Sequence, residues 1–383
     1  MIGVCALPDK RCIMAGMSKP QAFGPLAVFP STRPWPLHDA AASKRIEAAA
    51  LAACAPHELM QRAGLSVARL AMAVLPGASS AWVVAGPGNN GGDGLVAAAH
   101  LHALGWQARV TLLADVARMP PDARRALDCA QAAGVDIQWG WSGEQAASDI
   151  TIDALLGLGS TRPPVGDMEQ AILCMNKQAA PVLSVDLPSG LNVDTGATFG
   201  GEVVRADHTL ALLTLKPGLF TGVARDQVGR VWLDDLGMAQ AWSEPTARLV
   251  GPPERTVRLH QQHKGSFGDV LVLGGAPGMA GAAQLAATAA LAAGAGRVYL
   301  GAPGMIGLQA IPQRPELMLR HTADLMIEAA LSASTVVCGC GGGAWVEEVL
   351  PPVLRWAARL VLDADGLNAV AADPSLRRAL QRR

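Results

Sequence analysis

Three acidic segments hold the residues whose types and spacing could do chemistry. The stretch Gly88–Gly94 (GNNGGDG) places two side-chain amides and the carboxylate of Asp93 among four glycines. Asp153 and Asp186 each follow a short apolar run directly. In an open parallel sheet the carboxyl ends of the strands line one crevice, where ligands bind. We therefore expect the three segments to converge on a single site.

Carboxylate, amide and hydroxyl oxygens make a hard site that suits K⁺, Mg²⁺ or Ca²⁺ better than zinc. Two carboxylates in a partly desolvated crevice can also differ in pKa, so that one acts as an acid while the other stays ionised. Asp186 and Asp93 are the candidates for these two catalytic roles. A tight turn or a helix cap would explain each residue separately, and only their joint placement points to a site.

The glycine-rich segment follows an expected strand and precedes a helix expected over 95–104. Backbone N–H groups in such a loop can approach a phosphate closely, helped by the positive end of the following helix. The segment lacks the lysine of a Walker loop and the spacing of a GxGxxG motif. Neither standard nucleotide motif is therefore met.

The elements that must position these residues follow an alternating pattern. Alanine-rich sequence over 38–75 predicts helices, broken at Pro56 and Gly64. Beyond it, short apolar runs alternate with helical stretches, which is typical of a doubly wound parallel sheet. The expected strands are 81–85, 108–113, 150–154, 181–185, 209–213 and 230–233.

A second α/β region follows a polar, proline-bearing stretch. We expect a loose N-terminal arm over 1–33, a first domain over 34–243, a linker over 244–256 and a second domain over 257–383. The second domain is expected to hold a helix over 282–293 and four strands, at 269–273, 297–301, 335–338 and 360–362.

Composition narrows the class of protein. The chain has 383 residues, of which 50% are hydrophobic and 16% charged, and a formal net charge of -1. This balance suits buried parallel sheets and gives no basic field for nucleic acid or an anionic membrane, so a small molecule is the expected partner.

The seven cysteines are scattered, and Cys338 and Cys340 lack the spacing of a zinc site. No apolar run reaches the roughly 20 residues of a membrane helix, so we expect a cytoplasmic protein.

Four motifs together resemble the NAD(P)H-hydrate epimerase family over about residues 38–240. They are LMQRAG (59–64), GNNGGDG (88–94), DALLGLG (153–159) and VDLPSGLNVDTG (185–196), and Lys216-Pro-Gly fits the family as well. The resemblance implies a Rossmann-like three-layer α/β/α sandwich that interconverts the R and S hydrates at C6 of the nicotinamide ring. It implies K⁺ ligation by Asn90, Asp153 and Ser189. The implied substrate-binding residues are Asn89, Asn90, Gly91, Gly92, Asp93, Gly157, Leu158, Gly159, Ser160, Thr161, Arg162, Pro163 and Asp186.

The second domain resembles part of the ADP/ATP-dependent NAD(P)H-hydrate dehydratases, which have a ribokinase-like fold. The matching segments are HKGSFGDVLVLGGAPGMAGAA (263–283), AAGAGRV (292–298), PELM (315–318) and DADGLN (363–368). The resemblance implies that Ala282 and Gly341 touch the hydrated cofactor, although Cys338–Gly343 replaces the usual glycine-proline-glycine loop. The chain ends before the family's TPH, KG and GTGD segments. Without these segments in the chain, dehydratase activity with ADP or ATP and Mg²⁺ stays an open question.

Two other classes of function stay open at this point. One is a binding protein that keeps the epimerase fold without turnover, since a fold does not guarantee chemistry. The other is a small-molecule kinase, suggested by the ribokinase-like second half. The protein is also expected to be a homo-oligomer.

Overall fold

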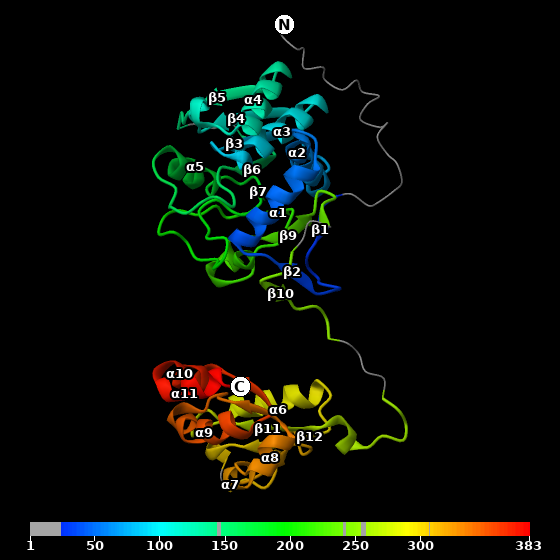
Figure 1. Cartoon of the computed structure of the whole chain (residues 1–383), viewed down its shortest axis with the longest axis vertical. Helices are drawn as coiled ribbons and strands as arrows, with labels where there is room; N and C mark the ends of the chain where they lie inside the picture. Colours follow the sequence, from blue (N-terminus) through cyan, green and yellow to red (C-terminus); the bar gives the residue numbers. More distant parts are fainter. Residues whose placement is uncertain (1–23, 144–146, 240–242, 254–257, 306) are drawn as a thin grey trace. The chain divides into compact units, whose positions relative to one another are not determined.

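The computed structural model describes residues 24–143, 147–239, 243–253, 258–305 and 307–383. The chain divides into two compact units, Met1–Glu254 and Arg255–Arg383 (Figure 1). Residues 1–23 of the expected arm and the end of the expected linker, 254–256, lie outside the described residues. Within the described residues, no helix has the length and apolar character needed to cross a bilayer.

The first unit is built on an eight-stranded sheet in the order β1-β9-β8-β7-β6-β3-β4-β5. All neighbouring strands are parallel except β1, which pairs antiparallel with β9. The strands are β1 (Leu26–Ala27), β3 (Ser80–Ala85), β4 (Gln107–Leu112), β5 (Asp136–Trp139), β6 (Ile150–Ala154), β7 (Val182–Val185), β8 (His208–Leu212) and β9 (Arg230–Asp234). The six strands expected from the sequence are confirmed.

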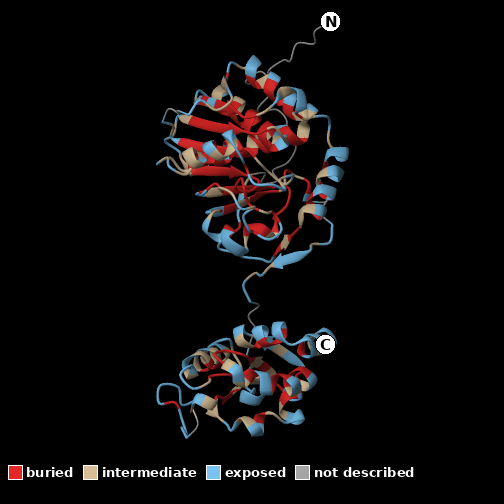
Figure 2. Ribbon diagram, turned by 90° about the vertical axis from the view of Figure 1, so that its left-hand side faces the viewer, coloured by how far each residue is buried: buried red, intermediate tan, exposed pale blue. Residues whose placement is uncertain are grey.

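Helices cover both faces of this sheet (Figure 1). They are α1 (Ala40–Ala53), α2 (Glu58–Val74), α3 (Asn89–Ala103), α4 (Pro121–Ala132) and α5 (Asp167–Met175). Val83 and Ala85 of β3 share a core with α2, α3 and α4, whereas Trp82 and Val84 share one with α5. The central strands are covered on both faces and are buried, as Figure 2 shows, and they consist mainly of apolar residues. The predicted three-layer α/β/α sandwich is confirmed.

Glycines set the close packing of helices in this unit. The helix expected from residue 95 begins at Asn89, so the predicted glycine loop is wrong and the segment forms the first turns of α3. A Cβ on Gly91 would lie 2.0 Å from the Gly86 oxygen, and one on Gly94 would lie 2.5 Å from the Ala154 Cβ. The predicted break at Gly64 is also wrong, because Gly64 lies inside α2 where a Cβ would meet Val96 at 2.4 Å. These glycines allow their helices to contact neighbouring segments closely, and they do not bend the chain.

Two segments expected to be irregular contribute short strands. β1 extends the main sheet and is followed by the fully buried Val28, so a loose arm through residue 33 is wrong. β10 (Ala247–Leu249) pairs with β2 (Trp35–Leu37), so a linker from residue 244 is also wrong. Strands of two or three residues leave too little alternation for a periodic signal.

The second unit holds a five-stranded parallel sheet in the order β13-β12-β11-β14-β15. Its strands are β11 (Asp269–Leu273), β12 (Arg297–Gly301), β13 (Met318–Leu319), β14 (Thr335–Cys338) and β15 (Arg359–Leu362). Its helices are α6 (Ala280–Ala292), α7 (Thr322–Leu325), α8 (Glu328–Ala333), α9 (Val346–Trp356), α10 (Ala364–Ala372) and α11 (Pro374–Gln381). The four predicted strands and the predicted helix are confirmed.

Candidate active site

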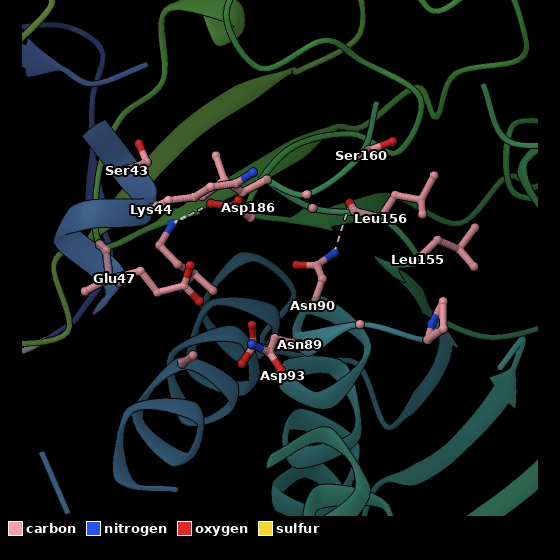
Figure 3. A pocket seen from close by; sticks show the side chains of 18 of the residues that line it. Ser43, Lys44, Glu47, Asn89, Asn90, Asp93, Leu155, Leu156, Ser160 and Asp186 are labelled. Carbon is pink, nitrogen blue, oxygen red and sulfur yellow. Dashed lines mark hydrogen bonds between the residues drawn. The ribbon is translucent and has the colours of Figure 1, made fainter. Parts of the chain in front are cut away.

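A cavity of about 920 Å³ opens in the first unit where the strands end (Figure 3). Its lining comes from the segments that follow β3, β6, β7, β8 and β9, together with α1 and the first turns of α2, α3, α4 and α5. The sequence-predicted residues on its wall are Asn89, Asn90, Asp93, Asp186, Gly157, Leu158, Gly159, Ser160, Thr161, Arg162 and Pro163. Asp93 and Asp186, the two predicted catalytic residues, therefore share one cavity.

Four other predicted residues of this unit lie behind the lining in the described part of the chain. Gly91 and Gly92 are buried in α3, where Gly91 lies against Gly86. Asp153 and Ser189 are almost completely inaccessible, with exposures of 0% and 1%. These residues shape the wall without forming its surface.

Asp186 lies in an unusual backbone conformation at the end of β7. Its φ is +69°, a region that non-glycine residues seldom adopt. Its carboxylate accepts hydrogen bonds from the Lys216 ammonium and the Leu212 backbone N–H. Lys216 is 2% exposed and also donates to the Leu212 carbonyl at 3.0 Å. Strain and a buried ion pair at one residue are typical of a functional site.

Asp93 faces the same cavity from α3. Burial raises the pKa of its carboxyl well above the ordinary value, and the charges of Asp186 and Glu47 raise it further. A carboxyl held in the neutral form can donate a proton at neutral pH. The two aspartates thus have different surroundings, as separate acid and base roles require.

Sequence reasoning missed Glu47, which lines the cavity from α1. Burial is the main cause that raises the pKa of its carboxyl, followed by the charge of Asp186, while Lys216, Lys44 and a hydrogen bond from Asn89 lower it. Glu47 lies in the middle of an alanine-rich helix and does not come directly after a strand. No local signal distinguished it from a residue on a solvated helix face.

Asp153 is a fully enclosed carboxylate. It accepts hydrogen bonds from Ser184 Oγ at 2.8 Å, Ser189 N–H at 2.9 Å and Ser189 Oγ at 2.6 Å. Burial raises the pKa of Asp153, and these hydrogen bonds oppose that rise. In this arrangement Asp153 fixes the loop after β7 to the end of β6.

The residues predicted to ligate a cation are linked through Leu156. The Asn90 amide donates to the Leu156 carbonyl at 3.1 Å, and the Leu156 N–H donates to Ser189 Oγ at 2.9 Å. Ser189 Oγ in turn donates to Asp153. An amide, a hydroxyl, a carbonyl and a carboxylate supply only hard oxygens, so the chemistry of the set fits a cation such as K⁺.

In the second unit, Ala282 and Gly341 lie side by side. Gly341 has a φ of +57°, and a Cβ added there would lie 2.9 Å from the Ala282 Cβ. Cys338 and Cys340 are buried, and burial raises the pKa of their thiols to about 12 and about 11 respectively. Both cysteines therefore stay protonated and behave as small apolar side chains.

An α/β/α sandwich with carboxylates gathered at the ends of its parallel strands defines the class of Rossmann-like enzymes. Residues 56–218 match the family model described as YjeF-related protein N-terminus, and residues 270–382 match the one described as NAD(P)H-hydrate dehydratase.

Curated relatives extend across both units. The bifunctional NAD(P)H-hydrate repair enzyme Nnr of Escherichia coli (strain K12) is 36% identical over 349 residues, which cover 86% of this chain and 66% of that protein. The enzymes of the same name from Coxiella burnetii and Gloeobacter violaceus are each 34% identical, over 84% and 87% of this chain and 68% and 70% of their own lengths. The chain belongs to the bifunctional NAD(P)H-hydrate repair enzyme family. It spans about two thirds of the length of these relatives.

Proposed function

We propose that the first unit epimerises the hydrates of NADH and NADPH, interconverting their R and S forms. The observation that carries this proposal is the presence of Asp93 and Asp186, in different electrostatic surroundings, on one cavity. The hydrate bears a hydroxyl on the ring carbon next to the ring nitrogen. Inverting that carbon requires one group that gives a proton and another that takes one.

Asp93 serves as the acid. It gives its proton to the hydroxyl as the carbon–oxygen bond breaks, and water leaves. The lone pair of the ring nitrogen forms a double bond to the carbon and carries the resulting positive charge. The carboxylates of Asp186 and Glu47 stabilise this cation electrostatically.

Asp186 serves as the base. Water returns to the opposite face of the ring carbon, and the Asp186 carboxylate takes its proton while the nitrogen recovers its lone pair. One proton has then passed from Asp93 to Asp186, and exchange with solvent restores both groups. Lys216 holds the Asp186 carboxylate in place throughout.

The remaining substrate contacts come from the lining segments. Asn89, Asn90 and the Gly157–Pro163 segment surround the cofactor, and the chemistry of Asn90, Asp153 and Ser189 supports K⁺ as the bound cation. K⁺ would supply positive charge near the carboxylates and hold the loops that carry them. A rise in melting temperature with KCl above that with NaCl, absent in Ser189→Ala, tests this site without an activity assay.

The experiment for the reaction starts from isolated R hydrate of NADH. Purified protein should produce the S form until both are present, at a rate far above that in buffer, as followed by chromatography. The Asp186→Asn variant should be slower by about 100-fold or more. If the wild-type protein does not accelerate the reaction, the binding-protein alternative is favoured. If Asp186→Asn epimerises at the wild-type rate, Asp186 is not the base.

We also propose that the second unit binds the hydrated cofactor beside Ala282 and Gly341 for ADP- or ATP-dependent dehydration, with Mg²⁺ on the nucleotide. The match of residues 270–382 to the dehydratase family model supports this proposal. Adding ADP or ATP to the S hydrate and following NADH absorbance tests it. Nucleotide consumption without NADH recovery would favour the kinase alternative. We further propose that the protein is a homo-oligomer that acts on a small molecule in the cytoplasm.

A further inference from the structure

Helix α1 is fixed against the site at several points. Asp39 caps its first turn by accepting from the Ala42 N–H at 2.7 Å, and Asp194 accepts from the Ala40 N–H at 2.7 Å. One turn further, the buried Ser43 hydroxyl lies 3.0 Å from the Thr214 hydroxyl in the segment after β8. The helix is thus fixed to the rim of the sheet one turn before Glu47. Such support gives the Glu47 side chain a defined position.

Glu47 reaches from α1 toward the first turns of α3 (Figure 3). Its half-buried side chain lines the cavity, as does the side chain of Asn89. Asn89 lies one helical turn before Asp93, so both side chains lie on one face of α3. Glu47 and Asp93 therefore approach each other from separate helices, with Asn89 beside them.

Carboxyls outnumber cations around this point. Glu47 and Lys44 come from α1, Asp93 from α3, Asp186 from the end of β7 and Lys216 from the segment after β8. Lys216 is bonded to Asp186, and Lys44 is exposed. Farther along the wall, Asp122 is paired with His57. Neighbouring carboxyls that are short of cations do not all ionise together.

We propose that Glu47 is a positioning residue for the reaction, whose carboxylate keeps the proton on Asp93 until the substrate hydroxyl accepts it. This inference rests on the proposed epimerisation. The division of roles follows from the surroundings: the charges of Lys216 and Lys44 favour the ionised form of Glu47, whereas burial and the neighbouring carboxylates all disfavour ionisation of Asp93. The negative charge of Glu47 then disfavours ionisation of Asp93.

The test is Glu47→Gln, with Glu348→Gln as a matched control on an exposed face of α9. Removing the negative charge of Glu47 lowers the pKa of Asp93. The falling limb of the kcat/KM profile against pH should therefore move to lower pH. Above that limb, a shift of one pH unit lowers kcat/KM about tenfold. The control should keep the wild-type profile, and Glu47→Asp, which retains the charge, should recover part of the shift.

A second measurement does not depend on turnover. The carboxyl ¹³C resonance of Asp93, assigned by its loss in Asp93→Asn, should titrate at lower pH in Glu47→Gln than in the wild-type protein. An unchanged Asp93 titration and an unchanged kcat/KM limb in Glu47→Gln would overturn the inference. If the wild-type protein does not epimerise the hydrate, the proposed function fails on its own, and the titration still decides whether Glu47 controls the Asp93 proton.

Discussion

The two units share a parallel α/β architecture but differ in what they bury. Among the described residues, the buried charged side chains Asp153, Asp186, Lys216 and Asp234 all belong to the first unit, whereas the buried polar residue of the second unit is Ser334. Enclosing charges costs free energy unless each finds a partner. Similar strands and helices therefore give two different interiors, and the proposed acid–base chemistry belongs to the interior that contains the charges.

The largest expected effect is on catalysis by the first unit. Asp93→Asn removes the proposed acid but keeps the shape of the side chain, so epimerisation should fall by about 100- to 10,000-fold. Asp324→Asn, an exposed change on α7 of the second unit, should leave the rate unchanged. Initial rates with R hydrate measure both. Equal rates in the two variants would contradict the contrast between the units.

The next effect compares an ion pair from each unit. Lys216→Met leaves the Asp186 carboxylate buried without its cation, which should lower the free energy of unfolding of the first unit by about 3–5 kcal/mol. The Arg297–Asp269 pair of the second unit is more open to solvent, so Arg297→Met should cost much less. Denaturant titrations of both variants provide the comparison. Similar losses would mean that burial does not distinguish the pairs.

Helical glycines give a smaller effect of opposite sign in the two units. Gly91→Ala places a Cβ 2.0 Å from the Gly86 oxygen, and this overpacking should cost about 1–3 kcal/mol. Gly281→Ala in α6 has nothing within 4 Å of the new Cβ, and should stabilise by about 0.4–1 kcal/mol through the unfolded chain. Thermal melts resolve changes of this size. Stabilisation by Gly91→Ala would show that α3 can move away from the sheet.

The smallest effect is a pH-dependent gain in stability. The pKa of Asp93 is raised in the folded protein above its ordinary value of 3.8, so the folded state holds this proton more tightly than the unfolded state. Stability therefore falls as pH rises above about 3.8 toward the raised pKa. Asn does not titrate, so Asp93→Asn should gain stability relative to wild type over that window. Melting temperatures from pH 4 to 8 should show a widening difference, and a constant difference would contradict the linkage.

The sequence predicted the parts of the site that directly follow the apolar strands of the main sheet. Asp186 could be placed because the carboxyl ends of parallel strands meet at one edge. Glu47 could not, because its position depends on how α1 packs across the sheet. The start of α3 was missed because the glycines of Gly88–Gly94 have low helix propensity, and tertiary packing overrides that preference. Lys216 was singled out only through the family resemblance, since nothing local marks it as the partner of Asp186.

The left-handed backbone at Asp186 limits which replacements are informative there. Asparagine tolerates a positive φ at least as well as aspartate, whereas most other side chains, alanine included, strain the chain in that region. An alanine variant would lose the carboxylate charge and would also disturb the path of the main chain. Either change could explain a low activity. Mutational tolerance at this position is therefore set by conformation as well as by chemistry, and an exchange to asparagine isolates the chemical part.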